Sequence, residues 1–212
     1  MSKRTTPKGK RSRAKVITAI YNLATVTDKN QGLNWYARAL DFADNLGEVY
    51  NINYTTIVGV IAALSPRNRW ERNMQDAETM VKVYANGGTY DDLMNLKVCT
   101  FKTGKCKAAE ILTGKVTNRQ ELLDILKGPK LQEFFNCILG DVDDVCIDGH
   151  AYSIWVGDRI TLADVPSIGK KLRDKIKSDY QRAAKDIGIK PHELQAITWV
   201  CWKRIHEVWA LM

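Results

Sequence analysis

The stretch that decides the fold is KGPKLQEFFNCILGDVDDVCIDGH, residues 127–150. A Gly128-Pro129 turn opens an amphipathic run in which Lys130 is the first residue after the turn. An apolar strip then leads to Asp148, which stands eighteen residues after Lys130. Gly and Pro mark a break between helices, and Asp is a preferred N-cap residue. We therefore expect a short helix after the turn and another helix that starts near Asp148.

Helical periodicity recurs on both sides of this stretch, and no segment alternates apolar and polar residues over a strand's length. The apolar run TTIVGVIAALS (55–65) has a strand-like length, but its Gly59 and Ala-Ala pair favour a buried helix. The sequence predicts an all-α chain with one compact helical domain over 15–212, and a two-lobed arrangement stays open. The other expected helices lie within residues 14–26, 32–52, 67–88, 89–96, 103–114, 117–126, 167–188 and 190–212.

Composition excludes several classes of protein. The chain has 212 residues, of which 45% are hydrophobic and 26% charged, as in ordinary globular domains. No apolar run approaches the roughly 18 residues that cross a bilayer, and the basic N-terminus does not resemble a signal peptide. The five cysteines form no CxxC pair, which favours reduced core residues over a zinc or iron–sulfur site. We expect a cytoplasmic protein without a metal or cofactor.

The charge distribution suits a polyanionic partner. The formal net charge is +8, and the first fifteen residues hold seven Lys or Arg and no acid. We expect residues 1–14 to form a disordered basic arm that adds non-specific phosphate contacts. A solubilising tail is the alternative interpretation of the same residues.

The turn at 127–129 lies between RQELLDIL (119–126) and KLQEFFNCIL (130–139), which predicts two short helices joined by a tight turn. Such a helix-hairpin-helix offers backbone N–H groups and a helix N-terminus to phosphate. With Lys130 and the later VCIDGHAYSIW, the stretch resembles the helix-hairpin-helix superfamily of base-excision DNA glycosylases, which includes endonuclease III-like and 8-oxoguanine glycosylase-like enzymes. In its bifunctional members a hairpin ends in a lysine, and an aspartate begins another helix just under twenty residues later.

The resemblance implies a DNA glycosylase-like fold and assigns roles to particular residues. Lys130 would be the nucleophile, and Asp148 the carboxylate that stabilises the oxocarbenium-like sugar. The resemblance extends over about residues 55–157 and also implies a set of DNA contacts. In these, Asn68 would fill the gap left by a flipped nucleotide. The remaining implied contacts are Arg67, Arg69, Gly104, Lys105, Lys107, Lys127, Gly128 and, in a supporting role, His150.

Two features differ from the family pattern. The usual hairpin reads Leu-Pro-Gly-x-Gly, whereas Leu126 occupies the place of the first glycine here, and Pro129 lacks an N–H donor. A second hairpin-like sequence, VPSIGKKLRDKI (165–176), has no Asp-x-His at a suitable distance after it. We interpret it as a surface turn and a basic helix face, with a second phosphate contact as the alternative.

The resemblance implies a monomeric enzyme of a prokaryotic or phage-infected cell that acts on double-stranded DNA. It would flip a damaged or modified base and cleave the N-glycosidic bond, with abasic-site lyase activity through Lys130 as an extension. Two alternatives stay open. One is a phage transferase that uses the same scaffold to hypermodify DNA bases, and the other is a non-catalytic DNA- or protein-binding relative.

Overall fold

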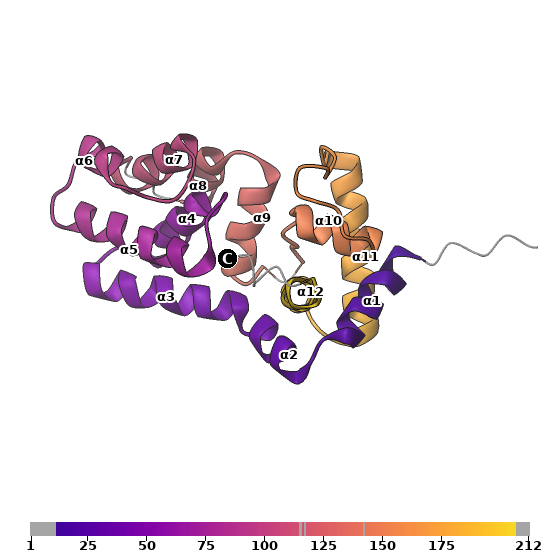
Figure 1. Cartoon of the computed structure of the whole chain (residues 1–212). Coiled ribbons are helices and arrows are strands. Elements are labelled where there is room, and N and C mark those ends of the chain that lie inside the picture. Colours follow the sequence, from indigo (N-terminus) through magenta and orange to yellow (C-terminus); the bar gives the residue numbers. More distant parts are fainter. Residues whose placement is uncertain (1–11, 115, 117, 142, 207–212) are drawn as a thin grey trace, which may run out of the picture. The chain divides into compact units, whose positions relative to one another are not determined.

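The computed structural model describes residues 12–114, 116, 118–141 and 143–206. Over these residues the regular structure consists of twelve α-helices with no strand, which confirms the all-α prediction (Figure 1). The described chain divides into two compact units. The first unit combines residues 12–32 with 147–206, and the second is the continuous segment 33–146.

The second unit is built around a helix that is buried on all sides. Helix α4 (Tyr54–Leu64) packs against five other helices of this unit, and its residues from Ile57 to Leu64 are buried. The interpretation of this apolar run as a buried helix is therefore confirmed. The other helices of the unit are α3 (Trp35–Tyr50), α5 (Trp70–Ala85), α6 (Tyr90–Asn95), α7 (Lys102–Thr113), α8 (Arg119–Leu126) and α9 (Pro129–Ile138).

Small residues let α7 approach α4 closely. A Cβ atom added to Gly104 would lie 2.6 Å from the carbonyl oxygen of Ala63, so only glycine fits there. At Gly59 an added Cβ would meet only side-chain atoms, the nearest of them Cδ2 of Leu122 at 3.1 Å. The contact between α4 and α7 therefore depends on a backbone position that has no room for a side chain.

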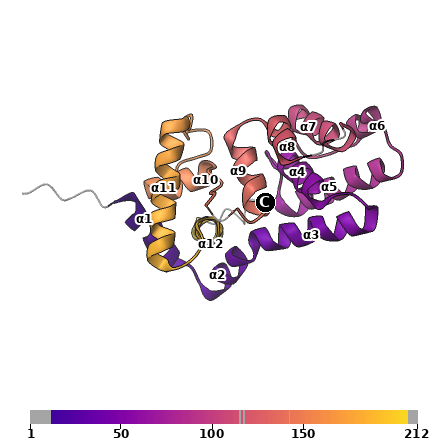
Figure 2. The same ribbon diagram turned by 180° about the vertical axis from the view of Figure 1, so that it is seen from behind.

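The first unit joins the two ends of the described chain. Its helices are α1 (Arg13–Leu23), α2 (Val26–Leu33, whose last residue belongs to the second unit), α10 (Gly149–Val156), α11 (Lys170–Ile187) and α12 (Pro191–Ile205). Helix α1 packs against α10, α11 and α12, so segments far apart in sequence share one core (Figure 2). Helix α1 begins at Arg13, so the predicted arm over 1–14 wrongly includes Arg13 and Ala14, which are helical. Residues 1–11 lie outside the described part.

A buried carboxylate ties α2 to α12 within the first unit. Asp28 is 4% exposed and accepts from the Arg204 Nε at 2.9 Å and from the Thr25 backbone N–H at 2.8 Å. The other end of the Arg204 guanidinium donates to the Leu23 carbonyl at 3.0 Å. Burial alone would raise the pKa of Asp28, but the hydrogen bonds from Thr25 and Arg204 outweigh it and hold the pKa below its ordinary value.

No helix in the described part of the chain is long and apolar enough to cross a bilayer.

The first prediction concerns the glycine at the α4–α7 contact. Gly104→Ala should destabilise the protein by about 1–3 kcal/mol, because its methyl group would press on a backbone carbonyl. Gly59→Ala is the matched control, since its neighbours are movable side chains and alanine favours the helix by about 0.5–1 kcal/mol. Urea unfolding of both variants measures the difference, and equal destabilisation would contradict the close contact.

The second prediction concerns pH. A lowered pKa in the folded state means that the ionised Asp28 stabilises the fold above the ordinary pKa of 3.8, and that this stability is lost as pH falls through the folded-state pKa. The difference in unfolding free energy between the wild type and Asp28→Asn should therefore be present near neutral pH and shrink below about pH 4. A difference that does not change with pH would show that the charge of Asp28 is not involved.

Candidate functional site

Asp148 is the N-cap of α10, as the sequence predicts. Its Oδ1 accepts from the Ala151 backbone N–H at 2.8 Å, which satisfies one donor of the first helical turn. The residue before it is also fixed, because Arg173 of α11 donates from Nη1 to the Ile147 carbonyl at 3.1 Å. The carboxylate is half-buried, and the backbone on either side of Asp148 makes a hydrogen bond.

Aromatic residues of α11 and α12 lie near the start of α10 inside the first unit. Tyr180 of α11 is fully buried, and this burial raises the pKa of its phenol. The Thr198 hydroxyl lowers that pKa and the negative charge of Asp148 raises it, so both groups lie near the phenol. In the first turn of α10, the His150 ring meets the Trp199 ring of α12 edge-on, with 6.4 Å between the ring centroids. His150 therefore packs on protein, and its supporting role in DNA contact stays a prediction.

Lys130 lies in the second unit, at the second position of α9. Helices α8 and α9 flank a two-residue turn in which Lys127 has a φ of 40° and Gly128 a φ of 96°. Gly128 suits this turn because side chains rarely adopt such a φ. Pro129 occupies the first helical position, where its missing N–H has no helical partner to lose. Gly128, Pro129 and Lys130 are all exposed.

The side chains of two predicted phosphate ligands bind backbone carbonyls of the protein. Lys107 donates from Nζ to the carbonyls of Leu126 and Lys127, at the C-terminal end of α8. Burial, and then the charge of Lys127, lowers the pKa of Lys107. Lys105 caps the end of α6 in the same way, because its Nζ donates to the carbonyls of Met94 and Leu96.

Gly104, expected to approach phosphate, is buried against α4 instead. The structure thus gives an internal role to all three predicted phosphate ligands of the GKCKA segment (104–108), a role that sequence reasoning had not assigned. The reason is spatial: a lysine beside the end of a neighbouring helix finds unpaired carbonyl oxygens there.

The loop between α4 and α5 points Asn68 inward. Its Nδ2 donates to Oδ2 of Asp76 at 3.0 Å. The same buried carboxylate accepts from Arg72 Nε at 2.7 Å and from the Cys99 backbone N–H at 2.8 Å. Asn68 is therefore part of the hub that holds two loops together. This geometry does not favour the gap-filling role for Asn68.

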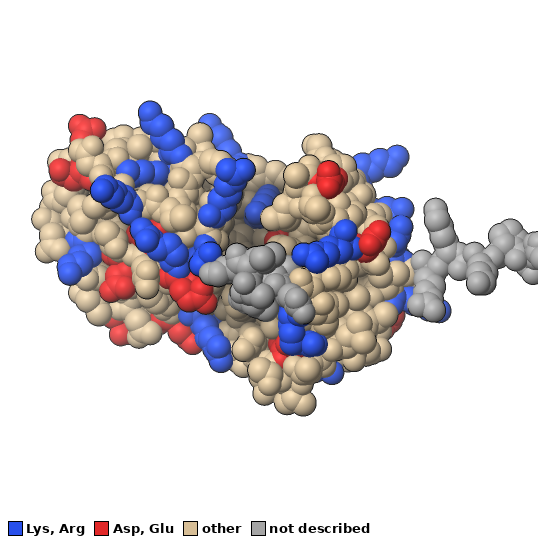
Figure 3. Space-filling view, in the orientation of Figure 1, with Lys and Arg blue, Asp and Glu red and all other residues tan. Residues whose placement is uncertain are grey.

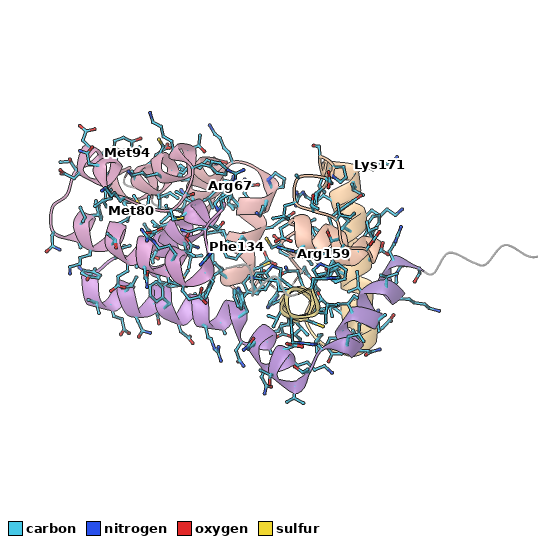
Figure 4. The ribbon with its side chains drawn as sticks, in the orientation of Figure 1. Arg67, Met80, Met94, Phe134, Arg159 and Lys171 are labelled. Atoms are coloured by element: carbon cyan, nitrogen blue, oxygen red, sulfur yellow. The ribbon has the colours of Figure 1, made fainter. Side chains whose placement is uncertain are left out.

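Arg67 is an exposed residue of this loop (Figure 4). Its φ is 57°, in the left-handed region, and its guanidinium carbon lies 5.0 Å from the centroid of the Phe101 ring. Phe101 is 47% exposed and immediately precedes α7. Arg69 is also exposed and is the N-cap residue of α5. Sequence reasoning missed Phe101, although an aromatic residue directly before a lysine at a helix start was a usable signal.

Other features of the described residues do not add to this site. No group of three His, Cys, Asp or Glu side chains in the described part could hold a metal ion. The acidic loop after α9 is tied down by protein contacts: Arg119 pairs with Asp141 at 3.2 Å, and Asn136 donates to Asp144 at 2.8 Å. A surface depression of about 660 Å³ is lined by residues at the end of α5 and in α6, and includes none of the candidate residues.

Comparison with known families assigns the chain. It matches the DUF7178 family, a family of unknown function, over residues 1–206, and it belongs to that family. Neither the curated proteins nor the solved structures include a significant match to this chain.

The third prediction separates the two properties of the Asp148 side chain. Asp148→Ala removes the N-cap acceptor and should destabilise the fold by about 0.5–2 kcal/mol. Asp148→Asn keeps an amide oxygen that accepts from Ala151 N–H, so it should stay much closer to the wild type. Urea unfolding curves compare the two variants. If both lose the same stability, the negative charge and not the cap is what stabilises α10.

Proposed function

We propose that this protein is a DNA-binding enzyme of the glycosylase type, which flips a damaged or modified base and cleaves its N-glycosidic bond. The observation that carries the proposal is the setting of Asp148. It follows a buried apolar strip, caps a helix, and holds a fixed carboxylate oxygen. Lys130 adds to this, because it is exposed at the start of α9 directly after a turn with positive φ.

The two residues suit the two halves of the chemistry. As the bond from C1′ to the base breaks, the base leaves with the electron pair and takes up a proton, and positive charge develops on the sugar. The carboxylate of Asp148 would stabilise that charge. The amine nitrogen of Lys130 would attack C1′ with its lone pair and, after ring opening and loss of a proton, form an imine. Loss of a C2′ proton then expels the 3′ phosphate. The proposal requires both groups to reach the same nucleotide.

DNA contacts would come from exposed groups of the second unit. The turn of Lys127 and Gly128 offers a positive charge and open backbone to a phosphate, and Figure 3 shows Lys and Arg side chains over the α7 to α9 region. Arg67, stacked with Phe101 at a loop tip, is the side chain best exposed to fill the gap left by a flipped nucleotide. Double-stranded DNA is the proposed partner, bound by a monomer with a helix-hairpin-helix turn.

The fourth prediction tests the nucleophile. Borohydride should trap a covalent adduct between the protein and duplex DNA that contains an abasic site, because it reduces the imine. Lys130→Ala should lower trapping to background. Lys82→Ala, which removes an exposed lysine elsewhere in the second unit, is the matched control and should trap like the wild type. Equal adduct formation by Lys130→Ala would remove Lys130 from the mechanism.

Base excision is measured separately. Oligonucleotides with different damaged or modified bases are incubated with the wild type and with Asp148→Asn, and the nucleosides and free bases are identified by mass spectrometry. Loss of the carboxylate charge should slow base release about 100-fold or more. A product of increased mass, with no released base, would replace the glycosylase proposal by the transferase alternative. An absence of both products would leave the non-catalytic alternative.

A further inference from the structure

The outer face of α11 carries a continuous row of cations. At about 3.6 residues per turn, Lys171, Lys175, Arg182 and Lys185 fall on one side of the helix, with Ser178 between them. All five are exposed. The row extends over roughly 21 Å at about 1.5 Å per residue. Figure 4 labels Lys171 at one end of this row, at the outer edge of the first unit. We call these five residues the α11 stripe.

The opposite face fixes the stripe on a rigid element. The indole Nε1 of Trp155 donates to the buried Asp179 at 2.9 Å, and Arg173 binds the Ile147 carbonyl at 3.1 Å. These bonds attach α11 to α10 and to the residue before Asp148. The side chains that α11 buries are Arg173, Ile176, Asp179, Tyr180, Ala183 and Ala184. The cations of the stripe therefore hold a constant spacing relative to one another.

Neighbouring charges leave the stripe positive. Arg182 has one long ion pair, at 3.9 Å, with Asp179, and Lys175 lies 5.6 Å from the Trp155 ring centroid. Asp174 and Asp186 are exposed, but the helical period places them at opposite margins of the stripe. The first turn of α11 contains no acid, although the positive end of the helix dipole lies there. Lys171 therefore adds its charge to an end that is already positive.

We propose that the α11 stripe binds the phosphate backbone of double-stranded DNA. Each DNA strand carries one phosphate per about 3.4 Å of helix axis, so the stripe spans roughly six phosphates of one strand. Lysine and arginine ends suit such contacts. Contacts to phosphate position a protein on the duplex without reading bases, so we expect binding by the stripe to be independent of sequence. This inference rests on the proposed DNA-binding function but not on the catalytic residues.

An anionic membrane is the other polyanionic surface to consider, and the helix does not suit it. A helix that lies in a membrane interface inserts its apolar face among the lipids. The apolar face of α11 is buried in the first unit. Ile176, Ala183 and Ala184 are among the α11 side chains buried there. The outer face presents cations, acids at the margins and Ser178 only, so a phosphate backbone fits it better.

The fifth prediction tests the stripe by its salt dependence. A variant with Lys171→Gln, Lys175→Gln and Lys185→Gln keeps helix propensity and loses three positive charges. Its affinity for a labelled undamaged duplex should fall at least tenfold at about 100 mM salt. The slope of log affinity against log salt should fall by about 2–3, since each lost phosphate contact removes about 0.9. Fluorescence anisotropy between about 50 and 200 mM salt measures both quantities.

The matched control removes three charges from exposed positions of the second unit, with Arg38→Gln, Lys82→Gln and Lys97→Gln. It should lower affinity less than threefold and leave the slope near that of the wild type. Equal effects on affinity and slope in the two variants would mean that binding depends on net charge alone, and the proposal for the α11 stripe would then be wrong. Binding of the wild type to anionic vesicles but not to duplex also overturns it, in favour of a membrane partner.

The inference and the proposed function fail in different ways. Suppose the triple variant of the stripe lowers the salt slope, but the wild type neither traps DNA nor releases a base. The glycosylase proposal is then wrong, and the α11 stripe is kept. If the wild type does trap DNA and release a base, but the triple variant leaves the salt slope unchanged, only the α11 stripe is wrong. Circular dichroism melting curves of both triple variants establish that the changes in affinity are not changes in folding.

Discussion

Close packing between α4 and α7 positions most of the second unit's candidate surface. Because Gly104 has no side chain, α7 can lie with its backbone against the Ala63 carbonyl of α4. This places Lys107 beside the end of α8, where its ammonium binds the carbonyls of Leu126 and Lys127. The turn that leads to Lys130 is thus held by Lys107 of α7, which lies twenty residues before Lys127. A backbone contact in the core therefore determines where an exposed lysine stands.

Basic residues serve two purposes in this protein, and the structure separates them. Lys105, Lys107 and Arg204 are bound to carbonyl oxygens of the protein, and Arg204 also to a buried carboxylate. These side chains stabilise helix ends and a helix–helix contact, so their charge is partly used inside the fold. Arg67 and the α11 stripe point outward instead. A net charge alone does not distinguish the two groups, which is why a charge count overstates the number of residues available to a ligand.

Local signals were enough to predict most helices and several of their ends. The cap at Asp148, the glycine after α7 and the proline at the start of α9 each act through bonds to near neighbours, which sequence spacing shows directly. The expected helix over 32–52 is instead the end of α2 followed by α3, because Leu33 ends one helix and Asn34 caps the next. No proline stands at this break, so the sequence pattern did not predict it.

The inward turn of Asn68 and the ligands of Lys107 could not be predicted in this way. Asn68 binds Asp76, and the same carboxylate also binds the backbone of Cys99, which is distant in sequence. Such contacts exist only once α4, α5 and α7 are packed together. The composition of the first unit from two separate segments could not be predicted for the same reason. Each segment by itself has the pattern of ordinary helices.

That discontinuity has a consequence for how the protein is made. The second unit is a continuous segment, so all of its residues are available once residue 146 has left the ribosome. Helix α1 buries Ile17 and Ile20 against helices that end as late as Ile205. At about 5–20 residues per second, these two side chains wait roughly 10–35 s for their partners during synthesis. During translation the apolar face of α1 therefore stays uncovered longer than the faces of the helices in the second unit, and we expect chaperones to bind the nascent chain at α1.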